Sequence, residues 1–269
     1  MKDKALAYFS GTGNTAWAAE SLAQMLDGYE VISIPVLLEH PEALENVRDL
    51  GILFPTYAFT PAIPTAYFIQ SCLPHCSKLE YLFSIATCSK TPGFGLKIVE
   101  DLCQRQNCLV SYSDFVRLPN SSPVLGDSGD VETIYAEAKP KLKAIAEAIS
   151  KSSIQIPRRK FLTKIIIGIY QKAMESSNAA NQDFIISEAC DMCLVCAQSC
   201  PAGAIVEKDG RLVFASPCYG CYGCINRCPK QAISFKNKQT TPRTEISRAF
   251  DYAQEEADFL RKLNDADKG

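Results

Sequence analysis

Eight of the thirteen cysteines lie between positions 190 and 228, in two runs of identical spacing. In each run three cysteines occupy every third position, and a fourth follows four residues later, directly before a proline. The first run is Cys190, Cys193, Cys196 and Cys200 with Pro201, and the second is Cys218, Cys221, Cys224 and Cys228 with Pro229. Without a recognisable export signal we expect reducing surroundings, in which cysteines stay thiols. The runs therefore predict metal ligands rather than disulfides.

The two runs belong to an internal duplication. Every ligand position recurs 28 residues later, and so does the apolar pair after each proline, Ala204-Ile205 and Ala232-Ile233. Each half is therefore expected to be one ligand loop followed by one apolar strand.

The spacing within each run favours an iron-sulfur cluster over zinc. Three thiolates at every third position can wrap one cluster in a tight loop. Structural zinc also uses Cys-x-x-Cys pairs, but it seldom needs a third close cysteine and a Cys-Pro in each half. Small residues among the ligands, Ala197, Gly220 and Gly223, let backbone amides approach the sulfurs.

A second group of candidate binding residues follows the first apolar run of the chain: Ser10, Gly11, Thr12, Gly13, Asn14 and Thr15. At a strand-to-helix junction, such a loop can hold a phosphate with backbone amides and hydroxyl groups. A glycine turn that binds nothing is the alternative.

The same loop fits G-x-G-x-x-A through Ala16, so a dinucleotide site has to be considered. No acidic residue ends the second expected strand to bind a ribose, since Ser33, Ile34 and Pro35 stand there. A Walker loop is excluded because no Gly-Lys-Ser/Thr follows. A ligand with a terminal monophosphate is therefore favoured over a dinucleotide for the loop at residues 10–15.

Apolar runs alternate with helical patterns over residues 1–150, which predicts an α/β fold with a doubly wound parallel sheet. The expected strands are residues 4–9, 29–34, 51–54, 81–86 and 109–116. The expected helices are residues 15–26, 64–73, 95–106 and 131–150, the last interrupted by Pro140.

The loop at residues 10–15 is similar to the phosphate loop of flavodoxins, whose ligand is FMN. The resemblance implies a five-stranded sheet of order 2-1-3-4-5, with the flavin at the carboxyl ends of strands one and three. Two further loops would flank its ring: Pro55, Thr56, Tyr57, Ala58 and Phe59, and Thr87, Cys88, Ser89, Gly93, Phe94 and Gly95. Tyr57 or Phe59 could stack on the ring, with packing against a helix as the alternative for each.

Residues 182–235 resemble the bacterial two-cluster ferredoxins along their whole length. In those proteins the fourth cysteine of each run ligates the other cluster. The resemblance therefore implies two 4Fe-4S clusters with crossed ligation. One is held by Cys190, Cys193, Cys196 and Cys228, and the other by Cys218, Cys221, Cys224 and Cys200.

Together the two resemblances point to the flavodoxin/ferredoxin fusion proteins of anaerobic bacteria and archaea. We expect an FMN-binding domain at 1–150, a helical linker at 151–181, a small α+β cluster domain at 182–238 and a C-terminal helix at 239–269. The expected function is electron transfer between FMN and the clusters, which couples one- and two-electron steps. A flavin-dependent reductase of a small molecule and a non-enzymatic redox sensor stay open, so enzymatic activity is undecided.

Composition narrows the expected partners. A net charge of -2 with 22% charged residues disfavours nucleic acid, and no apolar run is long enough for a membrane span. We expect a cytoplasmic protein whose partner is a ferredoxin-type donor or a reductase, and a homodimer is compatible with the sequence.

Residues 157–174 form a basic amphipathic pattern, more consistent with packing than with membrane contact. Neither His40 nor His75 sits in a catalytic pattern, and the cysteines at 72, 76, 103 and 108 are expected to be buried thiols.

Overall fold

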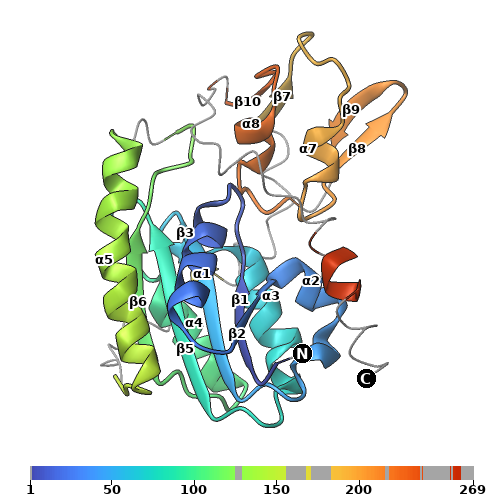
Figure 1. The fold of residues 1–269 in the computed structure, drawn as a ribbon. Coiled ribbons are helices and arrows are strands. Elements are labelled where there is room, and N and C mark those ends of the chain that lie inside the picture. Colours follow the sequence, from blue (N-terminus) through green and yellow to red (C-terminus); the bar gives the residue numbers. More distant parts are fainter. Residues whose placement is uncertain are drawn as a thin grey trace.

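The computed structural model describes residues 2–124, 129–155, 168–170, 183–215, 218–236, 238, 255 and 257–261. These residues form an α/β part at the N-terminal side and a small cysteine-rich part, which lie against each other (Figure 1). Among the described residues, no helix is both long and apolar enough to cross a membrane. The basic pattern at 157–174 lies outside the described residues except for 168–170, which are helical.

The main sheet has the strand order β2-β1-β3-β5-β6, and all these strands run parallel. Its strands are β1 (Lys4–Tyr8), β2 (Tyr29–Ser33), β3 (Asp49–Tyr57), β5 (Tyr81–Cys88) and β6 (Tyr112–Arg117). A two-residue strand, β4 (Thr60–Pro61), folds back antiparallel on β3. Counted along the chain, the five parallel strands have the order 2-1-3-4-5 that was predicted, which is the flavodoxin-like order.

Helices cover both faces of this sheet (Figure 1). One face packs on α1 (Asn14–Met25) and α5 (Val131–Ser150). The other packs on α2 (Ile34–Glu39), α3 (Ile63–Ser71) and α4 (Gly95–Arg105). Short 3₁₀ turns at Pro41–Leu44 and Leu73–His75 complete the connections. Because both faces are covered, the inner strand β5 is buried at every position.

Two local predictions were wrong. Ile34 was assigned to the second strand, but it opens α2, where Pro35 in the first turn suits a helix start. Pro140 was expected to interrupt the last helix, yet α5 runs through it. Pro140 faces solvent, so water can satisfy the backbone carbonyl that it leaves unbonded, while Leu142, Ile145 and Ile149 keep the opposite side of the helix in the core.

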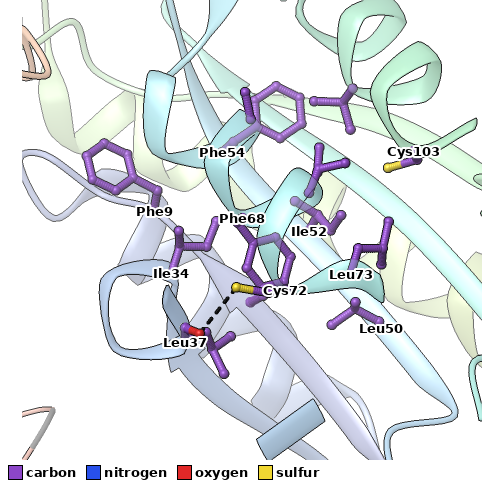
Figure 2. Packing of buried hydrophobic residues seen from close by; sticks show 14 of the residues in the cluster. Phe9, Ile34, Leu37, Leu50, Ile52, Phe54, Phe68, Cys72, Leu73 and Cys103 are labelled. Atoms are coloured by element: carbon purple, nitrogen blue, oxygen red, sulfur yellow. Dashed lines mark hydrogen bonds between the residues drawn. The ribbon is translucent and has the colours of Figure 1, made fainter. Parts of the chain in front are cut away.

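The front-half cysteines are packed among apolar side chains, as expected. Cys72 and Cys103 are fully buried in the cluster that contains Phe54 and Phe68 (Figure 2). The Cys72 thiol donates a hydrogen bond to the backbone oxygen of Leu37 at 3.2 Å. Burial raises the pKa of the Cys72 and Cys76 thiols to about 12. These thiols therefore stay protonated and act as packing groups.

The cysteine-rich part repeats one small unit. Each unit has a ligand loop, a short helix and a strand: α7 (Val195–Gln198) and β8 (Ile205–Lys208), then α8 (Gly223–Arg227) and β10 (Ile233–Phe235). Two more strands, β7 (Phe184–Ile186) and β9 (Arg211–Phe214), pair antiparallel with β10 and β8. The expectation of one loop and one strand per repeat is confirmed, but the strand β8 is apolar only in its first half, because Glu207 and Lys208 end it exposed to solvent.

The C-terminal residues return to the α/β part. Residues 257–261 are helical, and Phe259 is buried in the core near His40, with 5.7 Å between the ring centroids. Glu255 accepts a hydrogen bond from the Tyr8 hydroxyl. This part of the predicted C-terminal helix at 239–269 serves packing, and the rest of that range lies outside the described residues. The domain boundaries at 150, 181 and 238 stay a prediction.

Candidate functional site

The eight cysteines of the two runs surround two separate hollows. The first hollow is lined by Cys190, Cys193, Cys196 and Cys228. The second is lined by Cys200, Cys218, Cys221 and Cys224, and also by Cys196, which lines both hollows. The fourth cysteine of each run therefore faces the first three of the other run. This lining is consistent with the crossed ligation that the sequence resemblance implied, and the ligation itself stays a prediction.

Backbone geometry in the two ligand loops is duplicated as well. Met192 and Leu194 in the first loop have positive φ angles, and Gly220 and Tyr222 have them at the equivalent positions of the second. Only one of these four residues is a glycine, so their residue types do not indicate this conformation. The left-handed residues turn the chain tightly around each hollow.

Backbone amides reach the cysteine sulfurs. The Ala204 amide donates to Cys200 Sγ at 3.3 Å, and the Ala232 amide donates to Cys228 Sγ at 3.2 Å. Such hydrogen bonds stabilise the anionic thiolate that a metal requires and help to set the potential of a bound cluster. The apolar Ala-Ile pair after each Cys-Pro thus supplies a hydrogen bond as well as a strand.

The quartets fit clusters better than single ions. Among the described residues, no three His, Cys, Asp or Glu side chains converge closely enough to hold one metal ion. The cysteines instead line hollows with apolar walls, which include Ile205 and Phe214 in one and Leu212 and Ile233 in the other. Burial raises the pKa of Cys196 to about 11 and that of Cys221 to about 12, so binding of iron has to release these protons.

Hydrogen bonds fix the conformation of the loop at residues 10–15, which leads into α1. Gly13 has a φ of 91°, and its amide donates to Ser10 Oγ at 3.0 Å. The Thr15 and Thr87 hydroxyl oxygens lie 2.7 Å apart. Asn14 donates to the Pro119 carbonyl at 2.7 Å and accepts from the Tyr135 hydroxyl at 2.6 Å. The loop is therefore tied to β5, to the segment after β6 and to α5.

This loop forms one end of a cavity of about 420 Å³, a size typical of small-molecule sites. Most of the predicted flavin contacts line it: Ser10, Gly11, Thr12, Asn14, Thr15, Pro55, Thr56, Tyr57, Ala58, Thr87, Cys88 and Ser89. The sheet places them together because the loops after β1, β3 and β5 leave the same carboxyl edge.

The other predicted contacts lie outside the lining of this cavity: Gly13, Phe59, Gly93, Phe94 and Gly95. Phe59 is 60% exposed, and its backbone oxygen accepts from the Phe94 amide at 2.8 Å. Gly93 is packed so closely on Phe59 that an added Cβ would lie 2.5 Å from the Phe59 Cβ. These residues shape the outside of the loop, and of the two candidate stacking aromatics only Tyr57 faces the cavity.

Two groups of lining residues were missed. One is the segment after β6, which contributes Leu118, Pro119, Asn120, Ser121, Ser122 and Val124. Its position at the carboxyl edge of a strand was a usable signal. The other comes from the cysteine-rich part: Gly220, Cys221, Tyr222, Phe235 and Lys236. Nothing in their spacing indicates this role, since it depends on how the two parts dock.

The two parts touch through backbone and aromatic contacts beside the cavity. A Cβ added to Gly11 would lie 2.5 Å from the Cys221 Cβ, so the glycine is needed for this approach. Asn226 donates to the Ser121 carbonyl at 3.2 Å. The ring of Tyr219 lies 6.1 Å from that of Phe9 and 6.5 Å from that of Tyr67. A cysteine of the second quartet thus lies against the loop at residues 10–15.

Comparison with known proteins agrees with this division. Residues 189–233 match the family model described as 4Fe-4S dicluster domain. No curated protein matches the chain in sequence. The chain therefore combines a flavodoxin-like domain, identified by its strand order, with a 4Fe-4S dicluster domain.

Solved structures similar to the α/β part include a flavodoxin from the domain Archaea, with a TM-score of 0.39 and 16% identity over 55% of this chain and 98% of that one. A Fusobacterium nucleatum flavodoxin bound to flavin mononucleotide has a TM-score of 0.41 and 14% identity over 57% of this chain and 99% of that one. General stress protein 14 of Treponema denticola, in complex with FMN, has a TM-score of 0.37 and 10% identity over 55% of this chain and 97% of that one.

Proposed function

We propose that this protein transfers electrons between FMN and two 4Fe-4S clusters and thereby converts between one- and two-electron steps. The observation that carries the proposal is the position of Cys221. It belongs to the second cysteine quartet and also lines the cavity next to the phosphate loop. A flavin in that cavity would lie beside a cluster.

FMN suits the donors of the cavity. The phosphate would be bound at the start of α1 by backbone amides and by the Ser10, Thr12 and Thr15 hydroxyls, which line one end. The ring would lie further along, where Tyr57 comes from the α/β part and Tyr222 from the cluster part. Flavin accepts electrons in pairs and releases them singly, which is the chemistry that the cofactor supplies.

The clusters would be ligated in crossed fashion, three cysteines from one run and the fourth from the other. A ferredoxin-type protein or a reductase would exchange electrons with them. Chemistry on a small substrate over the ring would instead show as a return of the oxidised-flavin absorbance when that substrate is added to the reduced protein. A regulatory role of the clusters would show as a change of oligomer upon cluster reduction.

Cofactor content tests the proposal. Protein purified without oxygen and fully reconstituted should hold about eight irons, about eight sulfides and about one FMN per chain. Fewer than about six irons would contradict two four-iron clusters. Zinc in place of iron, or a chain that never retains flavin, would reject the proposed function.

Crossed ligation has its own test. Cys200→Ser should damage the cluster built on the second run, because Cys200 lines the hollow of Cys218, Cys221 and Cys224. The equivalent change in the other run, Cys228→Ser, should damage the first cluster. Electron paramagnetic resonance of the reduced variants separates the two signals. Damage to the cluster of its own run by each change would show uncrossed ligation.

A further inference from the structure

We infer that the two clusters have different places in the electron route. The inner one, held by Cys200, Cys218, Cys221 and Cys224, exchanges electrons with the flavin. The outer one, held by Cys190, Cys193, Cys196 and Cys228, exchanges them with a protein partner. This order of the clusters rests on the proposed function.

The lining of the interdomain cavity distinguishes the two clusters. Three consecutive residues of the second ligand loop, Gly220, Cys221 and Tyr222, form part of its wall. Among the described residues, no cysteine of the outer quartet contributes to that wall. The wall next to the phosphate loop is thus built from one ligand loop of the repeat and not from its equivalent.

Glycines allow this contact to be close. Gly11 of the phosphate loop and Gly223 at the start of α8 face each other, and an added Cβ on Gly223 would lie 2.6 Å from the Gly11 carbonyl oxygen. A side chain at either position would push the two parts apart. The equivalent of Gly223 in the first repeat unit is Val195, which is 37% exposed. The close approach is therefore built into only one half of the duplication.

The outer quartet has access to solvent instead. Cys193 is exposed, and the hollow of this quartet is bordered by Asp191 and Lys230, whose side chains are 45% and 53% exposed and form an ion pair at 3.4 Å. A partner can approach this cluster without entering the cavity between the two parts. Cys221, in contrast, is half-buried and is approached closely by Gly11, where an added Cβ would lie 2.5 Å from the Cys221 Cβ.

The electron count of the route is simple. A reduced one-electron carrier protein is oxidised at the outer cluster, and each electron passes to the inner cluster and then to the flavin. Two such transfers, with protons from water, complete the reduction of one flavin. The reverse direction oxidises the flavin and reduces two partner molecules.

The duplication provides a matched pair of variants. Cys218→Ala removes a ligand of the inner cluster and Cys190→Ala removes its equivalent in the outer one, and neither residue lines the cavity. The full-length variants would be mixed anaerobically with a photoreduced two-cluster ferredoxin as donor. Stopped-flow absorbance then follows the clusters and the flavin separately, after iron, flavin and resonance signals have established which cofactors each variant holds.

The expected patterns differ. In Cys218→Ala the outer cluster is reduced rapidly while reduction of the flavin lags far behind. In Cys190→Ala the inner cluster and the flavin are both reduced slowly, and they change together. The reversed pattern, or flavin reduction at the wild-type rate in Cys218→Ala, would overturn the cluster order. A wild-type protein that lacks iron or flavin would instead overturn the proposed function.

A second comparison keeps all eight cysteines, in case the loss of one ligand unfolds the cluster domain. Gly223→Ala introduces a Cβ against Gly11, whereas the Cβ of Gly168→Ala meets no atom within 4 Å and its backbone is not left-handed. With full iron and flavin content in both, slower flavin reduction in Gly223→Ala alone supports the inner position of the second ligand loop. Equal rates in the two variants would overturn it.

Discussion

At the scale of single residues, Arg227 is the charged side chain that we expect to affect the midpoint potential of the inner cluster most. It is 7% exposed, its guanidinium donates to the Ser199 carbonyl at 3.4 Å, and its positive charge opposes the effect of burial on the pKa of Cys221. A buried cation beside the second quartet favours the state of a cluster that carries one more electron.

Arg227→Gln should therefore lower the midpoint potential of the inner cluster by on the order of 50–100 mV, which follows from a charge interaction of about 1–2 kcal/mol. Redox titration followed by electron paramagnetic resonance measures this shift. Lys230→Gln is the control, because Lys230 is an exposed cation at the outer quartet. A similar shift of the inner cluster in both variants would show that the buried position of Arg227 is irrelevant.

The buried thiols of the α/β part predict how its stability depends on pH. Burial raises the pKa of Cys72 and Cys76 from 9.0 to about 12, so the folded state keeps protons that the unfolded state loses. Stability is then unaffected below about pH 8.5 and falls as the pH rises from there toward 12. Urea unfolding at constant ionic strength, followed by the fluorescence of the single tryptophan, Trp17, should show this loss of stability between pH 8.5 and 10.

The control for this prediction removes both thiols. Cys72→Ala with Cys76→Ala lowers stability at every pH through the loss of packing, but its unfolding midpoint should change less between pH 8.5 and 10 than that of the wild type. An identical pH dependence would assign the alkaline loss to other groups, such as the buried tyrosines.

At the scale of secondary structure elements, α5 contains a residue that lowers the stability of the helix. Pro140 lies in the helix interior, where proline is about 3 kcal/mol less favourable than alanine. Pro140→Ala should raise the free energy of unfolding by roughly 1–2 kcal/mol, since the greater entropy of the unfolded alanine chain offsets part of the gain. Urea unfolding measures the change. Lys139→Ala, at the neighbouring exposed position, should change stability far less, and an equal gain there would contradict the role of proline.

Elements also show how far sequence reasoning reaches. The five strands and their order followed from alternating apolar runs and the resemblance of one loop, because a strand buried on both faces needs a continuous apolar sequence. Pro140 and Ile34 were misjudged because local propensity gave way to the packing of a whole helix. The crossed pairing of cysteines came from the resemblance of the repeated runs to two-cluster ferredoxins, and it stays a prediction.

The missed part of the site depends on the whole molecule. The phosphate loop and the loops after β3 and β5 could be placed from sequence, since parallel strands bring their carboxyl ends to one edge. The wall formed by Tyr222, Phe235 and Lys236 could not, because it arises from docking of a second part whose own pattern concerns iron ligation. Docking rests on contacts far apart in the sequence, such as Asn226 with Ser121.

This arrangement means that the cluster part should contribute to flavin affinity. Lys236 lines the cavity, and its ammonium group pairs with Asp183 at 3.3 Å. FMN is anionic, so a carboxylate at this position, next to Asp183, opposes its binding. Lys236→Glu should therefore raise the dissociation constant for FMN about three- to tenfold, which corresponds to about 1 kcal/mol, and added salt should reduce the difference.

Titration of the flavin-free full-length protein with FMN, followed by flavin fluorescence, measures this constant. Lys238→Glu provides the same change of charge two residues away, at an exposed residue that does not line the cavity. If both variants weaken FMN binding equally, the effect is one of net charge, and the cluster part then has no specific role in holding the flavin. A loss confined to Lys236→Glu places the binding site between the two parts, because the residues that bind FMN then come from both ends of the chain.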